Sequence, residues 1–411
     1  MKLKIPNTSS VSFWLIASLL ISFALEVLVQ MKVIRDVPIL KMGQYLLLLF
    51  PISLAFLQVI FQRYNRENSI EQIPNLKFKN ELKLGLLLGL IFLVLTLLRS
   101  YSEGIFSANS ILEVFQITFP FIFSFVIVNF VSQKGITNFM KFSLIIVLIG
   151  LLFDERENLV VISNYLKISI FDSYSPFENN TFPQFAAPLG VYFVYHMRKY
   201  PFMAALALIV NFLIFKRVLL LMVIVLFIFR FFHLDKRFWK LGRYTKTYAT
   251  LWFCIILLTY HMYLPENRVY YEQLLDVNFA RFTVGRIYRF WYVNEQGFQS
   301  YGLGSTREFL FQKNLSYVGY DFEMDFIKTF FEIGPIAVAS YVFVMLKSCG
   351  KNIYAVLAVQ LYFLNYLMAN GMYQYWSVSL LLLSIACISN DEENLKYKQY
   401  MDKKIVKFRI V

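Results

Sequence analysis

The stretch from residue 201 to residue 232, PFMAALALIVNFLIFKRVLLLMVIVLFIFRFF, decides the topology of this chain. Before Arg230 its only charges are Lys216 and Arg217, so it forms either one long helix or a tight helical hairpin that turns at these two cations. Lysine and arginine gather on the cytoplasmic side of membrane proteins, and this rule separates the two forms once the long segment 265–328 is left out. A hairpin places a clear majority of the remaining basic residues on the side of a cytoplasmic N-terminus, whereas one long helix leaves the majority outside. The sequence therefore predicts a hairpin and two cytoplasmic termini.

The composition agrees with a membrane protein. Of the 411 residues, 58% are hydrophobic and only 16% are charged, which is more apolar surface than a soluble domain can bury. The net charge of +14 is typical of basic cytoplasmic loops, so we expect no nucleic-acid partner. Cys254, Cys349 and Cys387 lie in or beside apolar runs, a pattern that indicates neither a disulfide framework nor a metal site.

We therefore predict an all-α polytopic fold with about twelve transmembrane helices in one integral membrane domain, 1–411. A large extracytoplasmic loop, 265–325, separates the ninth helix from the tenth, and 390–411 forms a cytoplasmic tail. The expected spans are 11–30, 39–61, 82–98, 109–131, 140–153, 182–196, 201–215, 218–232, 247–264, 326–346, 352–369 and 372–389.

The large outer loop holds arginines among aromatic residues. If 279–293 is one helix, Arg286 and Arg289 are neighbours at a spacing of three, and Arg281 shares a face with Arg289. Guanidinium groups match phosphate oxygens in geometry, and a pair of them suits a diphosphate. The alternative is an ordinary amphipathic helix at the membrane interface.

Two further polar groups are expected on the outer face. Lys216 and Arg217, at the tip of the hairpin, either form an anion site near the membrane plane or extend to lipid headgroups. The loop 171–189 carries Asn179 and Asn180, which are either ordinary loop residues or part of a site on the outer face.

Three acidic residues, Asp321, Glu323 and Asp325, end the large loop. Glu323 and Asp325 are solvated loop acids, partners of the arginines, or candidates for a catalytic base.

In architecture and motifs the sequence resembles Wzy-type polysaccharide polymerases and the related O-antigen ligases. The motifs lie between about residues 175 and 340, and each is short. They are Asn179-Asn180 before a short span, Lys216-Arg217 before VLLLMVIVL, Gly285-Arg286, Trp291, Gly302-Leu303-Gly304, and Glu323-Met324-Asp325 before FIKTFFEIGPIAV.

The resemblance implies a GT-C-like glycosyltransferase on the outer face of the bacterial cytoplasmic membrane. Such an enzyme joins oligosaccharide repeat units carried on undecaprenyl diphosphate, and it uses no cofactor, nucleotide sugar or essential metal. Its donor and acceptor are both lipid-linked glycans, it contacts membrane lipid, and its pathway includes a flippase and a chain-length regulator.

The resemblance also implies roles for the candidate residues. Arg217, Arg286 and Arg289, with Lys216 and Arg281, would stabilise the leaving diphosphate. Glu323 or Asp325 would orient or deprotonate the acceptor hydroxyl, and Asn179, Asn180 and Trp291 would contact the glycan. The large outer loop contains no histidine, which favours a polymerase over a ligase. A lipid-linked oligosaccharide flippase or another transporter is the rival, and it would need polar groups along a central path.

Overall fold

The computed structural model describes residues 8–34, parts of 43–53, 76–157, 161, 182–313 and 322–389. Within these ranges the regular structure is entirely helical, which confirms the all-α prediction. The expected sites at Asn179, Asn180 and Asp321, the tail 390–411 and most of the expected span 39–61 lie outside the described residues.

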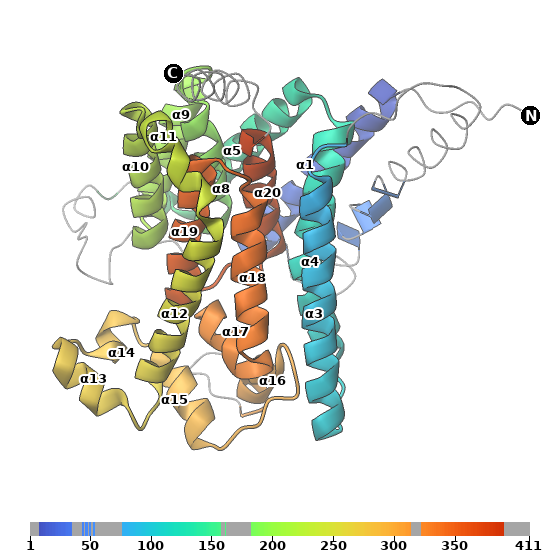
Figure 1. The fold of residues 1–411 in the computed structure, drawn as a ribbon. Coiled ribbons are helices and arrows are strands. Elements are labelled where there is room, and N and C mark those ends of the chain that lie inside the picture. Colours follow the sequence, from blue (N-terminus) through green and yellow to red (C-terminus); the bar gives the residue numbers. More distant parts are fainter. Residues whose placement is uncertain are drawn as a thin grey trace, which may run out of the picture. The chain divides into compact units, whose positions relative to one another are not determined.

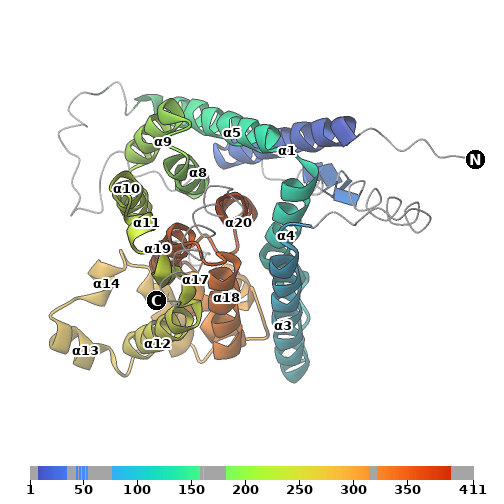
Figure 2. The same cartoon turned by 45° about the horizontal axis from the view of Figure 1, so that its top comes forward.

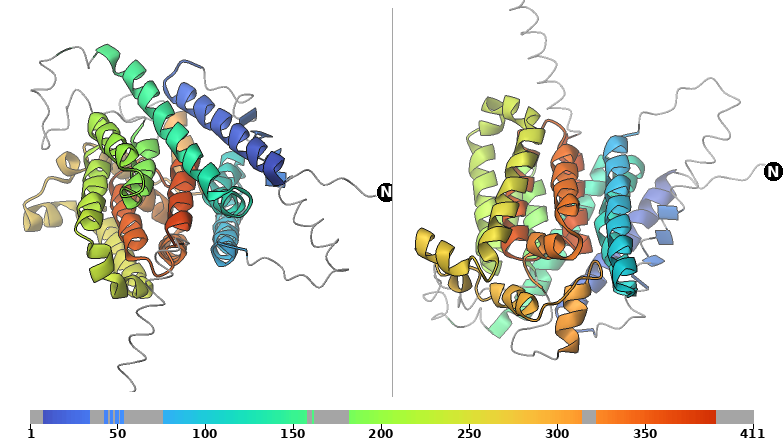
Figure 3. Two further views of the ribbon diagram at one scale, coloured as in Figure 1. Left: turned by 90° about the horizontal axis from the view of Figure 1, so that it is seen from above. Right: turned by 60° about the horizontal axis from the view of Figure 1, so that its bottom comes forward.

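The chain divides into two compact units, of which the first comprises Met1–Lys79, Ile122–Ile228 and Ser379–Val411. In this unit α1 packs along α5, and α8 packs against both α5 and α9 (Figure 3). Prolines begin α8 and α9, where a missing N–H costs no helical hydrogen bond. The helices are α1 (Thr8–Gln30), α5 (Gln133–Asp154), α8 (Pro183–Tyr195), α9 (Pro201–Ile214), most of α10 (Arg217–Phe231) and most of α20 (Tyr375–Ser389).

The apolar stretch 201–232 is divided into two helices at the position of its two adjacent cations. Helix α9 ends at Ile214, Phe215 adopts a left-handed conformation with φ 52°, and α10 begins at Arg217. The prediction of two helices in place of one long helix is therefore confirmed.

The second unit comprises Asn80–Phe121 and Phe229–Val378. Here α12, α18 and α19 stand beside one another, and α17 packs on all three (Figures 1 and 2). The short helices α13 to α15 gather at one end of α12, and α16 lies beside α17 (Figure 1). The bounds are α3 (Lys79–Glu103), α4 (Ala108–Phe130, divided between the units), α11 (Leu234–Arg237), η1 (Trp239–Arg243), α12 (Thr245–Tyr263), α13 (Arg268–Leu275), α14 (Phe279–Phe282), α15 (Ile287–Glu295), α16 (Ser305–Gln312), α17 (Asp325–Ile333), α18 (Pro335–Ser348) and α19 (Ile353–Met368).

Small residues let α3 and α4 approach closely. A Cβ atom on Gly85 would lie 2.2 Å from Cγ of Phe121, and one on Gly89 would lie 2.1 Å from Oγ1 of Thr118. Such glycines, one turn apart, are typical of helix contacts in membranes, where close backbone packing replaces the hydrophobic driving force.

The predicted span 326–346 is wrong as a single helix. It is two helices, α17 and α18, separated at Gly334, whose φ is 93°. Pro335 follows directly and cannot continue the preceding helix, because it has no N–H and its ring excludes the α conformation at the residue before it.

Four of the described helices are long and apolar enough to cross a membrane: α1, α3, α4 and α5. A fifth candidate is α12 with α13, which are bent by 112° relative to each other, and α9, α18, α19 and α20 are shorter apolar helices. Helix α3 exposes a series of leucines, including Leu86, Leu90 and Leu98. Exposed apolar faces on helices of this length are those of a helical membrane protein.

Candidate functional site

A tight turn divides the segment that we expected to be one helix over 279–293. Helix α14 ends at Phe282, and Val284 and Gly285 have positive φ angles of 55° and 78°. The N–H of Gly285 donates to the carbonyl of Ala280 at 2.7 Å, which closes the end of α14 as a glycine after a helix commonly does. The single-helix prediction is therefore wrong, and the glycine was the signal against it.

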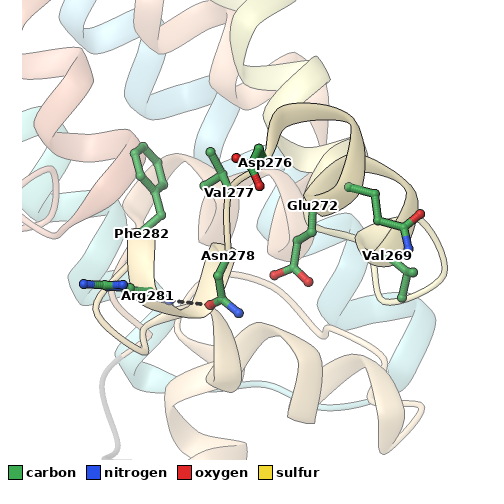
Figure 4. Close-up of a pocket in the computed structure, with 8 residues that line it drawn as sticks. Val269, Glu272, Asp276, Val277, Asn278, Arg281 and Phe282 are labelled. Atoms are coloured by element: carbon green, nitrogen blue, oxygen red, sulfur yellow. Dashed lines mark hydrogen bonds between the residues drawn. The ribbon is translucent and has the colours of Figure 1, made fainter.

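The turn separates the three arginines into two groups. Arg281 stays on α14, beside a pocket that α13 and α14 form (Figure 4). Arg286 is the residue immediately before α15, and Arg289 lies in the first turn of that helix. The expectation that Arg281 and Arg289 share a helix face is wrong, whereas Arg286 and Arg289 are brought together.

Glu323 joins these two arginines. Nε of Arg286 donates to Oε2 of Glu323, and Nη1 of Arg289 lies 3.5 Å from Oε1 of the same carboxylate. The three side chains are 17%, 19% and 28% exposed, so they are partly desolvated but still open to a ligand. The two guanidinium groups direct charged N–H donors at one carboxylate, and the same donors match the oxygens of a phosphate.

Thr283 holds the arginines in place from inside the turn. Its side chain is fully buried; Oγ1 donates to the carbonyl of Phe279 at 2.8 Å and accepts the N–H of Ile287 at 3.3 Å. Its carbonyl accepts Nη1 of Arg286 at 3.3 Å. The start of α15 and the direction of Arg286 are therefore fixed by the fold.

Asp325, the other candidate base, lies in a different environment. It is 3% exposed, and its Oδ2 accepts the backbone N–H of Met372 at 2.7 Å. Burial raises the pKa of the Asp325 carboxyl to about 7, against the opposing effects of the Lys328 ammonium and of the N–H of Met372. Asp325 thus ties the segment between α19 and α20 to the start of α17.

Trp291 is a packing residue in this structure. It is 5% exposed, and its indole N–H donates to the carbonyl of Tyr263 at 2.8 Å. The guanidinium of Arg268 lies 4.0 Å from the ring centroid, in a cation–π contact. The indole face and its donor are both engaged within the protein, and the predicted glycan contact receives no support from this placement.

The glycine pair forms a turn that α3, α4 and α17 hold together. Gly302 and Gly304 have φ angles of 125° and 76°, which glycine adopts without steric cost. Oγ of Ser100 donates to the carbonyl of Tyr301 at 2.7 Å, and Oγ of Ser110 donates to the carbonyl of Leu303 at 2.6 Å. We call residues 300–306 the glycine turn.

A buried charge network lies behind the glycine turn, and the sequence did not predict it. Nζ of Lys328 donates to both carboxylate oxygens of Glu113 at 2.8 Å. The fully buried carboxylate of Glu332 accepts the N–H of Gly304 at 2.9 Å and that of Thr306 at 3.0 Å. Glu113 lies in the predicted span 109–131 and Glu332 in the predicted span 326–346, so their sequence positions do not connect them. The four-residue spacing of Lys328 and Glu332 on α17 is the local sign that these two residues share a site.

A second carboxylate, that of Glu308, also holds the glycine turn in place. Glu308 on α16 accepts hydrogen bonds from the hydroxyl of Ser107, from Nδ2 of Asn109 at 2.6 Å and from the hydroxyl of Tyr301 at 2.5 Å. Burial opposes the charge of Glu308, but these hydrogen bonds outweigh it and hold the pKa of Glu308 below its usual range. Glu308 is therefore a charged, fully bonded anchor.

The other expected cations belong to the first unit. Lys216 and Arg217 are half-buried at the break between α9 and α10. The structure groups Arg286, Arg289 and Glu323 within the second unit, and the shared site that we expected for all these cations stays a prediction.

Among the described residues, no three His, Cys, Asp or Glu side chains are arranged to hold a metal ion. No known protein family, curated protein or solved structure matches this chain.

Proposed function

We propose that the chain is a membrane-bound glycosyltransferase that polymerises undecaprenyl-diphosphate-linked oligosaccharide repeat units into O-antigen or capsular polysaccharide. The observation that carries this proposal is the cluster of Arg286, Arg289 and Glu323. Two partly exposed guanidinium groups that point at one carboxylate are already arranged for two negatively charged oxygens on adjacent phosphates.

In the proposed reaction, the hydroxyl oxygen of the acceptor glycan attacks the anomeric carbon of the donor. The bond from that carbon to the diphosphate breaks, and the lipid diphosphate leaves with the electron pair. Arg286 and Arg289 stabilise the charge that develops on it. The hydroxyl proton passes to a carboxylate, for which Glu323 and Asp325 are the candidates.

Glu323 has a further part in this scheme. In the structure it occupies the guanidinium groups that a diphosphate would bind. An incoming diphosphate therefore displaces Glu323, and the released carboxylate becomes available to the acceptor hydroxyl. Binding of the donor and activation of the acceptor are coupled in this way.

The proposal places the chain in the bacterial cytoplasmic membrane. About twelve helices cross it in a GT-C-like arrangement, both termini lie in the cytoplasm, and the segment 265–325 faces outward. The partners are the two lipid-linked glycans and membrane lipid, with a flippase and a chain-length regulator acting in the same pathway. The apolar helices of the described residues support the membrane location in this proposal.

Chain extension in cells tests the proposal. Cells that express Arg286→Ala or Arg289→Ala in place of the wild-type chain should display mostly single repeat units, because the leaving diphosphate loses a charged partner. Arg307→Ala is the matched control, since it removes an exposed arginine from α16 of the same unit. The readout is the length distribution of the displayed glycan, with the amount of each variant in the membrane measured alongside.

The outcomes separate the related functions. Normal chain lengths in Arg286→Ala cells would exclude the diphosphate role. If the chain is a polymerase, cells without it should display single repeat units on the outer face. If it is a ligase, cells without it should retain finished polymer on the lipid carrier.

A transporter of lipid-linked oligosaccharides is the second candidate, because of the ion pair of Lys328 and Glu113. Paired ionisable residues buried among membrane helices often mark ion or proton paths. Repeat units that remain on the cytoplasmic face in cells without this chain would favour the transporter over the polymerase.

A further inference from the structure

A pocket of about 770 Å³ lies between α13 and α14, in the second unit. Its volume is within the range of small-molecule sites, about 300–1,000 Å³. Figure 4 shows the side chains of Glu272 and Asn278 directed toward a common space, while the guanidinium of Arg281 extends away from Glu272. The lining residues are Val269, Glu272, Gln273, Asp276, Val277, Asn278, Arg281 and Phe282.

The walls of the pocket are fixed by the fold. Glu272 accepts Nε of Arg268 at 3.0 Å and the backbone N–H of Phe279 at 2.7 Å, so it joins α13 to the start of α14. The side chain of Asn278 caps α14 by accepting the N–H of Arg281 at 2.8 Å. Arg268 in turn stacks on the buried Trp291. A preorganised frame of this kind lowers the entropic cost of binding a ligand.

Three polar side chains at the pocket are not used by this frame. Gln273, Asp276 and Arg281 are exposed, and no hydrogen bond or ion pair within the described residues engages their side chains. Each presents planar donors or acceptors that suit neighbouring hydroxyl groups. Beside them Phe282, which is 52% exposed, offers an apolar ring face.

The charges of the pocket exclude a strong anion site. Glu272 is paired with Arg268, and among the other lining residues one carboxylate, Asp276, balances one guanidinium, Arg281. At Glu323, by contrast, two guanidinium groups meet one carboxylate. A neutral, hydroxyl-rich ligand with an apolar face fits the pocket better than a phosphate does.

The pocket is also adjacent in the chain to the arginine cluster. Only the turn at residues 283–285 separates α14 from Arg286, and α14 and α15 contact each other. A lipid-linked repeat unit has its sugars bonded to its diphosphate. We propose that the pocket of α13 and α14 binds uncharged sugar residues of the lipid-linked glycan, while Arg286 and Arg289 bind its diphosphate. This inference rests on the proposed function.

The test measures sugar binding separately from chain extension. The probe is the oligosaccharide released from the lipid-linked repeat units of the producing cells, added to the purified full-length chain and followed by saturation-transfer NMR and titration calorimetry. The pocket variant combines Gln273→Ala with Asp276→Gly; glycine keeps the left-handed backbone of residue 276, whose φ is 51°. Gln296→Ala, an exposed glutamine outside the pocket, is the control.

We expect the pocket variant to bind the released oligosaccharide about tenfold more weakly, because it lacks two side chains that form hydrogen bonds to the sugar. Gln296→Ala and Arg286→Ala should bind it like the wild type, because the probe carries no diphosphate. Thermal unfolding of the pocket variant should match that of the wild type.

Four results would overturn the inference. The pocket is not a sugar site if the pocket variant binds the oligosaccharide with wild-type affinity, or if the wild-type chain does not bind it. In either case the proposed function stands as long as the wild type still extends chains. Loss of sugar binding in Arg286→Ala would overturn the division of sugar from diphosphate. Unchanged glycan length in cells without the chain would refute the proposed function and this inference with it.

Discussion

Replacing Lys328 by methionine is the most direct test of the buried charge network. Methionine has a similar length, so the change removes the ammonium with little change in volume. Lys328 is 5% exposed and Glu113 is 8% exposed, so the carboxylate left behind cannot be solvated in place. Breaking a buried ion pair by removing one partner costs about 3–5 kcal/mol.

The expected effect on thermal unfolding follows from this value. For a folding unit of about 150–250 residues, 1 kcal/mol shifts the midpoint by about 2–4 °C, so Lys328→Met should lower it by about 6–20 °C. The measurement is loss of tertiary fluorescence or of monodisperse elution on heating the purified chain in detergent. Lys313→Met, which changes an exposed lysine after α16, should change the free energy of unfolding by less than about 0.5 kcal/mol.

A double variant shows whether the loss comes from the pair. Adding Glu113→Leu to Lys328→Met removes the unpaired carboxylate and should recover about 2–3 kcal/mol, because buried pairs replaced by apolar residues are often nearly neutral. A midpoint for Lys328→Met within 2 °C of the wild type, or a double variant whose losses simply add, would refute this reasoning.

Three further predictions concern the glycine turn, the candidate base and the topology. Gly302→Ala should lower the unfolding free energy by about 1–3 kcal/mol, because the φ of residue 302 is 125° and a Cβ atom there would lie 2.8 Å from the methyl group of Thr96 in α3. The measurement is thermal unfolding of the purified chain. Gly297→Ala is the control and should cost less, because the space around Gly297 is open. If Asp325 is the base, chain extension in membranes should rise with pH through a midpoint near the pKa of about 7, because only the carboxylate accepts a proton, and the rise should vanish in Asp325→Asn. A rate that is flat across neutral pH would exclude that role. A cysteine in place of the exposed Gln273 should react with an impermeant maleimide on intact cells, and one in place of Lys240 only after permeabilisation; the opposite pattern would invert the topology.

Much of the helical framework could be predicted from local sequence. The break near Lys216 follows from two charges inside an apolar run, and proline marks the first turn of α8, α9 and α18. The break at Gly334 was missed because the apolar run continues through it, although the Gly–Pro pair was the relevant signal. Apolar run length measures compatibility with a membrane, and backbone conformation depends on single residues within the run.

The candidate site was predictable only where its parts are close in sequence. The three-residue spacing of Arg286 and Arg289 was enough to place them together. Glu323 lies 37 residues from Arg286 and was one of several open options. Lys328 and Glu113 are 215 residues apart, and no periodicity or charge pattern connects them. Contacts of this kind depend on how the fold brings side chains of α4 and α17 together, which one sequence does not reveal.

The two candidate bases differ because of the residue between them. Met324 has a φ of 83°, so the chain turns there and sends Glu323 and Asp325 into different surroundings. Glu323 reaches the arginine cluster and is 28% exposed, whereas Asp325 is enclosed and bonded to the N–H of Met372. A base must touch the acceptor hydroxyl, and only Glu323 is placed where a bound diphosphate would also lie. The placement therefore favours Glu323 for contact with substrate, while Asp325 first serves to hold the segment between α19 and α20 against α17.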